Sequence, residues 1–295
     1  AEDNTFVGRQ AGKATTTGNS NTGMGKDALL SNTTGVDNVA IGRASMEQNT
    51  TGSYNTAVGG YGTLDANTTA NNNTAIGAGV LTVNTTGAAN TAVGAYSLDA
   101  NTTASSNTAV GYASLSGNTT GTENVAVGRS ALGANTTASS NTAVGTESLQ
   151  ANTTGTDNTA LGAGALKTNT TSSNNTGLGK YALLFSTGTE NTAVGSGSLR
   201  TLSTGNYNTA VGYESLRLAT TSNENTAVGY YALGANTTGA SNTAMGSAAL
   251  DANTTASNNT AFGAEALSAN TTGGENTGIG RYGLAANTTG SNNVA

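Results

Sequence analysis

Carboxylates are the side chains through which this sequence could perform acid–base chemistry, because its 295 residues include 16 Asp and Glu but no His and no Cys. Without His or Cys, the usual nucleophile–base pairs and most transition-metal sites cannot be assembled. Six carboxylates share one position of the repeat described below, each at least two repeats from the next: Asp37, Glu123, Asp157, Glu190, Glu224 and Glu275. This spacing keeps like charges about 10 Å apart, roughly a Debye length. We therefore expect no enzyme, metal site or cofactor, with structural calcium at an isolated carboxylate as an open alternative.

Tyrosine is the other residue type that points to function. Seven tyrosines lie one or two residues after a recurring Gly, where a turn would expose them: Tyr96, Tyr112, Tyr181, Tyr213, Tyr230, Tyr231 and Tyr282. An exposed aromatic ring can stack on a sugar, so Tyr112, Tyr213, Tyr230 and Tyr231 are candidate glycan-stacking residues. Ordinary packing at a turn is the alternative interpretation.

One repeat must position all of these residues. The pentapeptide Asn-Thr-Ala-Val-Gly, or a close variant, recurs along the whole chain, and we number repeat positions 1 to 17 from its Asn. These Asn residues are at 4, 21, 38, 55, 73, 90, 107, 124, 141, 158, 175, 191, 208, 225, 242, 259, 276 and 293. The spacing is 17 residues except for one interval of 18, with an extra residue near 60–63, and one of 16, with a shortened corner within 180–190. The sequence predicts a single uninterrupted repeat region over 1–295, with incomplete repeats at both ends.

The composition of the repeat favours strands over helices. Seventeen residues are too few for the helix pair of a helical repeat, which needs about 33 residues. Gly and Asn are poor helix formers, and the β-branched residues Thr and Val favour strands. The sequence therefore predicts an all-β fold, a parallel β-solenoid of about 17 coils in which equal repeat positions stack on one another.

Two large apolar columns are the predicted core of this solenoid. Position 4 is Val, Ile, Leu, Met or Phe in the complete repeats, and position 9 is Leu in nearly all of them. Gly at position 5 of every complete repeat predicts a positive φ or a very close backbone approach. Asn at positions 1 and 12 predicts left-handed corners and ladders of side-chain hydrogen bonds between coils.

Position 3 is restricted to Ala and Gly in the complete repeats, apart from Phe6. Alternation along a strand predicts that position 3 faces away from position 4, and therefore outward. An outward column of such small residues indicates close packing against another chain; a small residue facing solvent is the alternative. The predicted interchain packing residues are Ala57, Ala109, Ala160 and Ala244.

Assembly would compensate for a small core. One Val and one Leu per coil bury little apolar surface, so a second face buried between chains would add stability. A homotrimer around a threefold axis is the natural closed assembly for such a chain, and an end-to-end filament is the open one.

The repeat also resembles known fibres. Asn-Val-Ala-Ile-Gly at 38–42 and Asn-Val-Ala-Val-Gly at 124–128 resemble the head repeats of trimeric autotransporter adhesins. The unit Asn-Thr-Ala-Val-Gly-Tyr-x-Ser-Leu with a following Asn-Thr-Thr-Gly, at 107–121, is similar to repeats of bacteriophage tail fibres and related fibres that carry a self-cleaving chaperone of the endosialidase type. The resemblance covers the whole chain and implies a trimeric, left-handed parallel β-roll. Adhesin heads have a shorter repeat, so these coils would carry a longer outer corner.

Charge and hydropathy narrow the function further. The net charge is −6, and such a chain lacks the clustered cations that bind a nucleic-acid backbone. No stretch approaches the roughly 18 consecutive apolar residues of a membrane span. We expect an extracellular structural or adhesive fibre segment, on a cell surface or virion, whose partners are copies of itself and a cell-surface glycan or protein.

Ice binding through Thr ladders is the alternative function, because ranks of Thr on a flat solenoid face can match a lattice. The adjacent Thr residues at positions 13 and 14 argue against it, since neighbours in a strand point to opposite sides.

Overall fold

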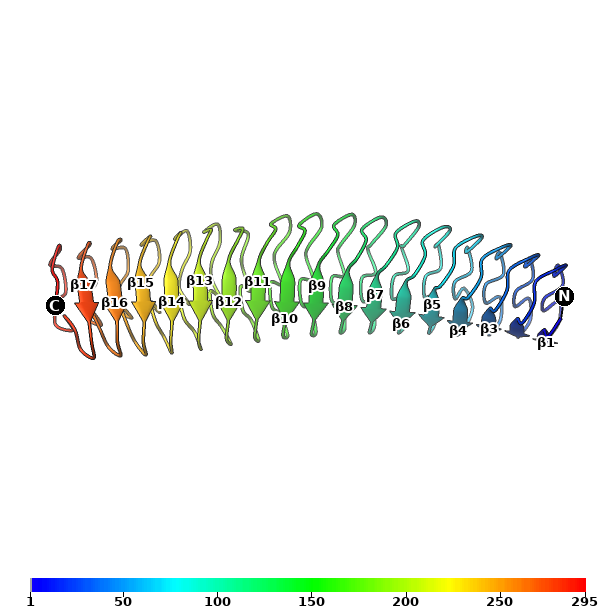
Figure 1. The fold of residues 1–295 in the computed structure, drawn as a ribbon, viewed down its shortest axis with the longest axis horizontal. Helices are drawn as coiled ribbons and strands as arrows, with labels where there is room; N and C mark the ends of the chain where they lie inside the picture. The colour runs from blue at the N-terminus through cyan, green and yellow to red at the C-terminus, as the bar shows by residue number, and fades with distance from the viewer. Residues whose placement is uncertain (1) are drawn as a thin grey trace. The chain divides into compact units, whose positions relative to one another are not determined.

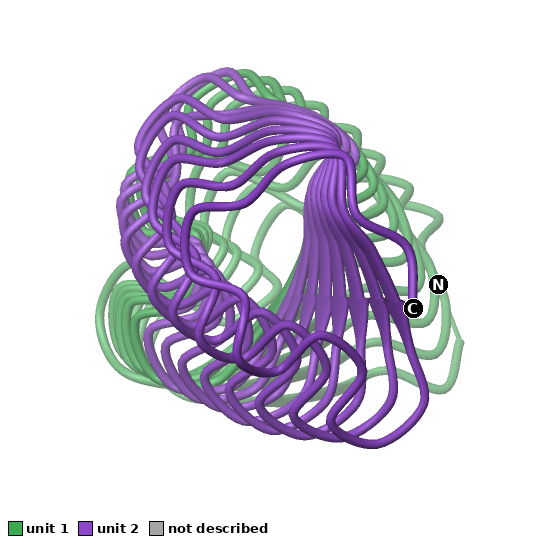
Figure 2. Ribbon diagram, turned by 90° about the vertical axis from the view of Figure 1, so that its left-hand side faces the viewer, with its two compact units in different colours: residues 1–147 green, residues 148–295 purple. Residues whose placement is uncertain are grey.

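The computed structural model describes residues 2–295, which form short β-strands and no helix. The first compact unit is Ala1–Glu147 and the second is Ser148–Ala295 (Figure 2). Strands of the first unit are β1 (Thr5–Val7), β2 (Thr22–Met24), β3 (Val39–Ile41), β4 (Thr56–Val58), β5 (Thr74–Ile76), β6 (Thr91–Val93), β7 (Thr108–Val110), β8 (Val125–Val127) and β9 (Thr142–Val144). Those of the second are β10 (Thr159–Leu161), β11 (Thr176–Leu178), β12 (Thr192–Val194), β13 (Thr209–Val211), β14 (Thr226–Val228), β15 (Thr243–Met245), β16 (Thr260–Phe262) and β17 (Thr277–Ile279).

Equal repeat positions stack in both units. Each strand covers positions 2–4 and pairs in parallel with the strand of the next coil within its unit (Figure 1). In the first unit Ala109 pairs with Ala126 and Val110 with Val127, and in the second Val211 pairs with Val228. The prediction of an all-β parallel solenoid with a 17-residue repeat is confirmed, with about 16 turns.

Backbone hydrogen bonds extend well beyond the three-residue strands. Leu115 N donates to Ala131 O at 2.9 Å, Thr119 N donates to Thr136 O at 2.9 Å, and Ser130 N donates to Tyr112 O at 3.0 Å. Three separate segments of one coil thus bond to a neighbouring coil. This bonding holds the coil together although no strand is longer than three residues.

The prediction of which face is inside is wrong. Ala57, Ala109, Ala160 and Ala244 are all 0% exposed within a single chain, so they cannot pack against a second chain. Position 4 is the outward column instead, and Ile279 there is 62% exposed. The alternation between positions 3 and 4 was predicted correctly, but the inner and outer faces were exchanged.

The narrowness of the coil explains this exchange. Leu at position 9 is fully buried along the chain, from Leu29 to Leu267. A Cβ built on Gly177, at position 3, would lie 3.4 Å from Cγ of Leu166, at position 9 of the preceding coil. Position 3 therefore contacts the leucine column directly. A methyl group fits there in van der Waals contact, whereas a larger side chain would overpack the interior.

The first coil exchanges the sizes at these two positions. Phe6 stands at position 3 and Gly12 at position 9, where most other coils have Ala and Leu. A Cβ on Gly12 would overlap the Phe6 ring, and one on Gly23 would lie 2.8 Å from Cδ1 of Phe6. In the first coil, Phe6 at position 3 thus fills the interior space that Leu at position 9 fills in most other coils.

Asn residues form the predicted ladders but not the predicted left-handed corners. Asn124 Nδ2 donates to Asn107 Oδ1 at 3.2 Å in the preceding coil and to Ala138 O at 2.8 Å in its own coil. The Asn at position 12 of the same coil, Asn135, donates to that carbonyl at 2.9 Å. The two Asn columns therefore converge on one carbonyl. Asn124 and Asn135 are both fully buried.

The left-handed corners fall at positions 7, 9 and 17. In one coil they are Ala113 at φ 50°, Leu115 at φ 52° and Glu123 at φ 59°. For a residue as bulky as Leu this conformation is a true outlier. It persists because the leucine side chain is buried in the coil and its N–H bonds the next coil.

Glycine at position 5 meets both predicted requirements. Gly111 has φ 132°, and a Cβ there would lie 2.7 Å from Gly128 O of the next coil. At Gly111 both the conformation and the space exclude a side chain, which gives the recurrence of Gly at position 5 a physical cause.

The two irregular intervals are changes at corners, as predicted. In the long coil the extra residue precedes Thr63, and Leu64 regains the buried position 9. In the short coil Ser186 replaces the Asn of position 12. This replacement leaves Asn169 Oδ1 buried without a hydrogen-bond partner, because the Asn that would donate to it is missing.

Candidate functional site

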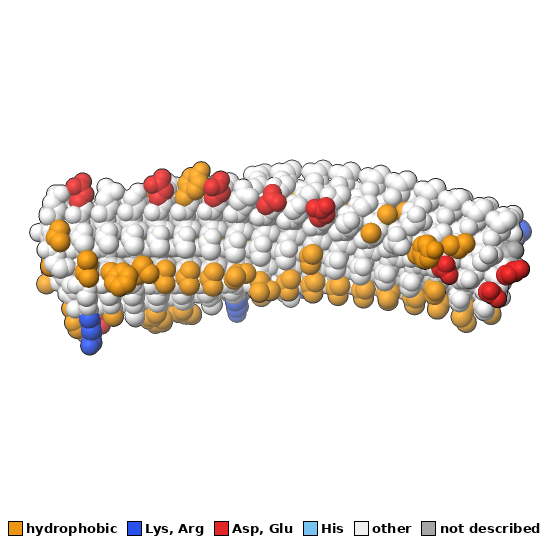
Figure 3. All heavy atoms as spheres, viewed as in Figure 1, with side chains coloured by type: hydrophobic (Ala, Val, Ile, Leu, Met, Phe, Trp, Pro, Cys, Tyr) orange, Lys and Arg blue, Asp and Glu red, His pale blue; other side chains and the backbone are white. Residues whose placement is uncertain are grey.

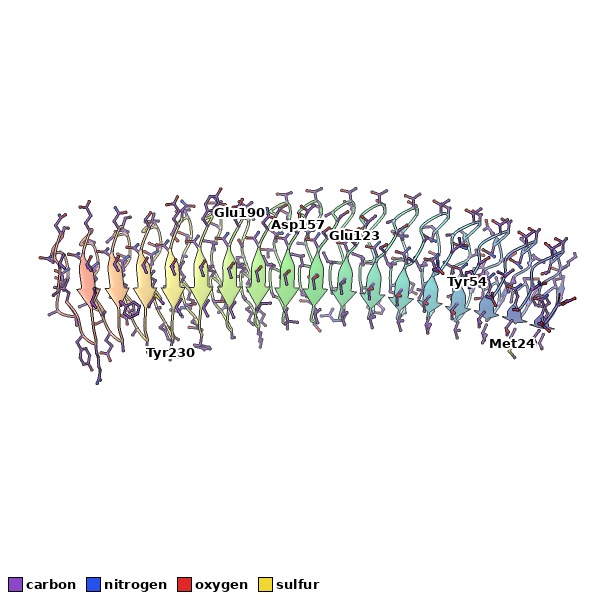
Figure 4. The ribbon with its side chains drawn as sticks, in the orientation of Figure 1. Met24, Tyr54, Glu123, Asp157, Glu190 and Tyr230 are labelled. Carbon is purple, nitrogen blue, oxygen red and sulfur yellow. The ribbon has the colours of Figure 1, made fainter. Side chains whose placement is uncertain are left out.

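Three of the four candidate tyrosines form one cluster in the second unit. Tyr213 and Tyr230, at position 6 of consecutive coils, stack with ring centroids 5.7 Å apart and planes 12° apart. Tyr231 lies edge-on to Tyr230, with a centroid distance of 4.5 Å. Tyr230 is 56% exposed, and Figure 4 shows it at the edge of the unit opposite Glu190. The predicted exposure is confirmed for Tyr213 and Tyr230, whereas Tyr231 is half-buried.

A charged pair supports the cluster from beside Tyr231. A hydrogen bond to the Glu214 carboxylate raises the pKa of Tyr231 to about 12, with desolvation and the Glu214 charge acting in the same direction. Arg217 pairs with that carboxylate, NH1 to Oε2, at 3.4 Å, and its guanidinium lies 5.7 Å from the Tyr231 ring centroid. Tyr231 is thereby fixed and uncharged, while Tyr213 and Tyr230 present their rings to solvent.

Tyr112 lies apart from this cluster, in the first unit. It meets Tyr96 edge-on, with ring centroids 5.9 Å apart, and is exposed. The four candidate residues therefore form two separate aromatic surfaces. Only the one in the second unit combines stacked rings with charged side chains.

Residues at position 7 lean toward the preceding coil, which the sequence did not reveal. A Cβ on Gly164 would lie 2.8 Å from Cδ1 of Tyr181, and one on Gly79 would lie 3.0 Å from Cδ1 of Tyr96. In both cases a position-7 Gly makes room for the ring that follows it by one coil. A Gly followed 17 residues later by Tyr is the signal that could have located these rings.

The outward sheet face is the second candidate surface. Positions 2 and 4 of each strand point outward together, as in Thr108 and Val110, so Thr and large apolar residues form parallel columns. No position-4 side chain is buried among the described strands, and Phe262 is 55% exposed. Figure 3 shows rows of hydrophobic side chains within each unit, and Figure 4 shows Met24 at the strand end away from Glu123.

The threonine columns at positions 13 and 14 differ in their exposure. Thr33 Oγ1, at position 13, donates to Thr50 O of the next coil at 2.9 Å, and the same bond recurs along the chain. Thr34, at position 14, is exposed. Since the hydroxyls at position 13 bond the backbone, position 14 alone presents free threonine at this corner.

Within the described residues, 2–295, no three carboxylates lie close enough together to hold a metal ion. Those at position 17 lie on an exposed edge, where Figure 4 shows Glu123 in the first unit and Asp157 and Glu190 in the second. Three others, at position 10, are half-buried, and each has a buried Oδ1 without a hydrogen-bond partner: Asp65, Asp99 and Asp251.

These three aspartates are expected to weaken the fold at neutral pH. Burial raises the pKa of Asp65, Asp99 and Asp251 above 3.8. A carboxyl with a raised folded-state pKa stabilises the fold below its unfolded pKa, and this contribution is lost as the pH rises through the folded value. Replacing all three with Asn should therefore raise the urea midpoint at pH 7, and the gain should shrink as the pH falls toward 3.

An exposed carboxylate provides the control for this experiment. Asp157→Asn, at position 17, should change the urea midpoint much less at either pH. A triple variant that is less stable than the parent at pH 7, or equally affected at both pH values, would contradict the assignment.

No family model matches this chain, and no curated protein sequence matches it either. Within residues 2–295 the structure contains no helix that is long and apolar enough to span a bilayer. The fold and its columns define the class of the molecule: a parallel β-solenoid repeat protein.

Proposed function

We propose that this chain is a segment of an extracellular structural and adhesive fibre on a cell surface or virion, whose copies assemble side by side into homotrimers. The observation that supports this most directly is the outward column of large apolar residues at position 4. In the first unit it runs through Val7, Met24, Ile41, Val58, Ile76, Val93, Val110, Val127 and Val144. Contiguous exposed apolar surface of this kind marks an interaction site.

Copies of the same chain fit this column best. The column repeats with the spacing of the coils, about 4.8 Å, so a parallel copy in register meets it at every coil. It is also one side chain wide, with a half-buried Thr at position 2 beside it. Three such narrow columns can meet at a threefold axis, where each covers the other two.

In this proposal the tyrosine cluster binds the surface to which the fibre attaches. Tyr213 and Tyr230 are exposed in the second unit, and the neighbouring position-6 residues along the column are Ser196 and Ser247. Serines are too small to cover an aromatic ring. The stacked pair therefore keeps apolar surface for the face of a sugar or for a protein receptor.

The assembly is tested by placing charges on the apolar column. The parent should elute with a mass three times the 28.7 kDa of one chain in light scattering. Val93→Lys, Val110→Lys and Val127→Lys combined should convert it to a folded monomer, because stacked ammonium groups cannot be buried at a shared axis. A lysine at these half-buried outward positions can still reach water in the monomer.

The control carries the same charges on another face of the same coils. Thr103→Lys, Thr120→Lys and Thr137→Lys lie at exposed position 14 and should leave the trimer intact. A monomeric parent would overturn the proposed assembly. A parent mass that grows with concentration, without a plateau, would replace the trimer with a filament.

Ice binding is the second candidate, because one structural observation favours it. The outward Thr and Val columns at positions 2 and 4 form a regular two-column array on a sheet face. This arrangement differs from the Thr pair at positions 13 and 14 that argued against ice binding. Thermal hysteresis in the parent, lost in the Val93, Val110 and Val127 lysine variant, would assign the face to ice instead of to a second chain.

A further inference from the structure

A second surface in the second unit has cations without acidic partners. Lys180 Nζ lies 4.9 Å from the Tyr181 ring centroid, and the Arg200 guanidinium lies 5.7 Å from the same centroid. Both cations are exposed, and in the described part of the chain neither forms an ion pair or a side-chain hydrogen bond. One aromatic ring therefore gathers two positive charges whose counter-charge is missing.

Other cations of this unit are differently placed. Arg217 pairs with Glu214, and Arg281 donates to the Tyr282 hydroxyl at 2.8 Å. Arg281-Tyr282 repeats the cation–tyrosine order of Lys180-Tyr181 at positions 6 and 7, but no second cation approaches its ring. The pair of unneutralised cations is thus particular to the ring of Tyr181.

Local packing fixes the position of this ring. Tyr181 leans onto Gly164 of the preceding coil, where a Cβ would lie 2.8 Å from its Cδ1. Tyr181 acts here as a positioning residue, since its ring attracts both cations by a cation–π interaction. Both cations are therefore held beside one ring instead of being dispersed in solvent.

The short coil also carries an exposed aromatic residue, whose backbone bonds that of Arg200. Phe185 is 49% exposed, and its N–H donates to Arg200 O at 3.2 Å. It lies in the irregular coil of 16 residues, where Ser186 follows it in place of Asn. The ring that both cations approach is that of Tyr181, which is itself 38% exposed, so the surface offers cations for an anionic group and an aromatic ring beside them.

We infer that Lys180 and Arg200, beside the exposed ring of Tyr181, form a binding site for an acidic glycan, with the carboxylate of a uronic or sialic acid on the cations. The inference rests on the attachment role proposed above and adds to it a second surface with a named ligand class. Carboxylate fits because charge-assisted bonds to Lys and Arg are the strong polar contacts available here. The net charge of the chain is −6, so its overall electrostatic field does not attract an anionic ligand. Recognition of such a ligand therefore depends on Lys180 and Arg200.

Calorimetry with matched sugars tests the site. The full chain should bind 3′-sialyllactose and tetragalacturonate, and bind lactose at least tenfold more weakly. Lys180→Ala and Arg200→Ala should each lower affinity for the acidic probes by roughly tenfold, the effect of about 1.4 kcal/mol, and together they should abolish the preference over lactose. Tyr181→Ala should weaken binding of both acidic probes, because it removes the ring that holds both cations.

Arg281→Ala is the matched control, since it removes a cation beside a tyrosine without touching this site. It should leave binding of both acidic probes unchanged. Equal binding of lactose and the acidic sugars, or equal losses in Arg281→Ala and in the Lys180 and Arg200 variants, would overturn the inference. Light scattering on the same samples reports the trimer separately, so failure of the assembly and failure of the site are distinguishable.

Discussion

Gly111→Ala should lower the free energy of unfolding by about 3–5 kcal/mol, the sum of backbone strain and steric overlap. Gly111 has φ 132°, which L side chains rarely adopt, and its added Cβ would lie 2.7 Å from Gly128 O. The overlap is with backbone of the next coil, so relief would require separating coils that are hydrogen-bonded above and below. Urea denaturation followed by circular dichroism measures the change.

Two other glycines separate the effect of backbone strain from the effect of steric overlap. Gly280 has φ 94° but no atom within 4 Å of an added Cβ, so Gly280→Ala should show strain alone, about 1–3 kcal/mol. Gly60 has neither an unusual φ nor a near neighbour, and Gly60→Ala should be within about 0.5 kcal/mol of the parent. Equal losses at Gly111 and Gly60 would show that the close stacking of the glycine column is incorrect.

Asn124→Asp is expected to be nearly as damaging, although it replaces only an amide NH₂ by oxygen. Asn124 Nδ2 lies 3.2 Å from Asn107 Oδ1 and 2.8 Å from Ala138 O, and both are acceptors. A buried carboxylate there would face two acceptors with no proton to share. The expected loss at pH 7 is about 3–5 kcal/mol, typical of an uncompensated buried charge.

The pH dependence distinguishes this cause from general disruption. Burial raises the pKa of such a carboxyl, and its protonated form regains one donor, so the loss should shrink as the pH falls. Asn72→Asp is the control, because Asn72 lies at the exposed last position of its coil, and the residues at that position in the two neighbouring coils, Tyr54 and Ala89, are uncharged. The stability of this control should stay close to that of the parent. If Asn124→Asp lost the same stability at every pH, the proposed ladder of Asn side-chain hydrogen bonds would be contradicted.

The winding of the chain was predictable because it depends on periodicity. A 17-residue spacing fixes which residues stack, and the pairing of Val110 with Val127 follows from it. The stacking of Gly and the Asn ladders follow for the same reason. A column repeated at every coil has only its own copies as neighbours, so its chemistry can be derived from one repeat.

The direction in which each column points was not predictable from residue size. Val110 is larger than Ala109, and apolar size usually marks the core. The interior of this coil is already filled by Leu115 and its equivalents, so only a methyl group fits at position 3. The diameter of the coil decides this, and it depends on left-handed corners at residues such as Leu115 and Glu123, whose types do not signal that conformation.

The candidate site was predictable only in part, for a related reason. The exposure of Tyr213 and Tyr230 followed from their place directly after the position-5 glycine, whereas Tyr231, one residue further on, is half-buried. The bond from Tyr231 to Glu214, and the approach of Arg200 to Tyr181, depend on how side chains lean between coils. Repeat numbering gives the coil and the position, but not the direction of that lean.

A pair of adjacent lysine substitutions tests the orientation of the columns most directly. Val110→Lys should retain the β-sheet circular dichroism of the parent and a cooperative urea transition, because its ammonium can reach water. Ala109→Lys should lose most of that signal or several kcal/mol of stability, because a charge would enter a side-chain position that is 0% exposed. The reverse outcome, a folded Ala109→Lys and an unfolded Val110→Lys, would contradict this account.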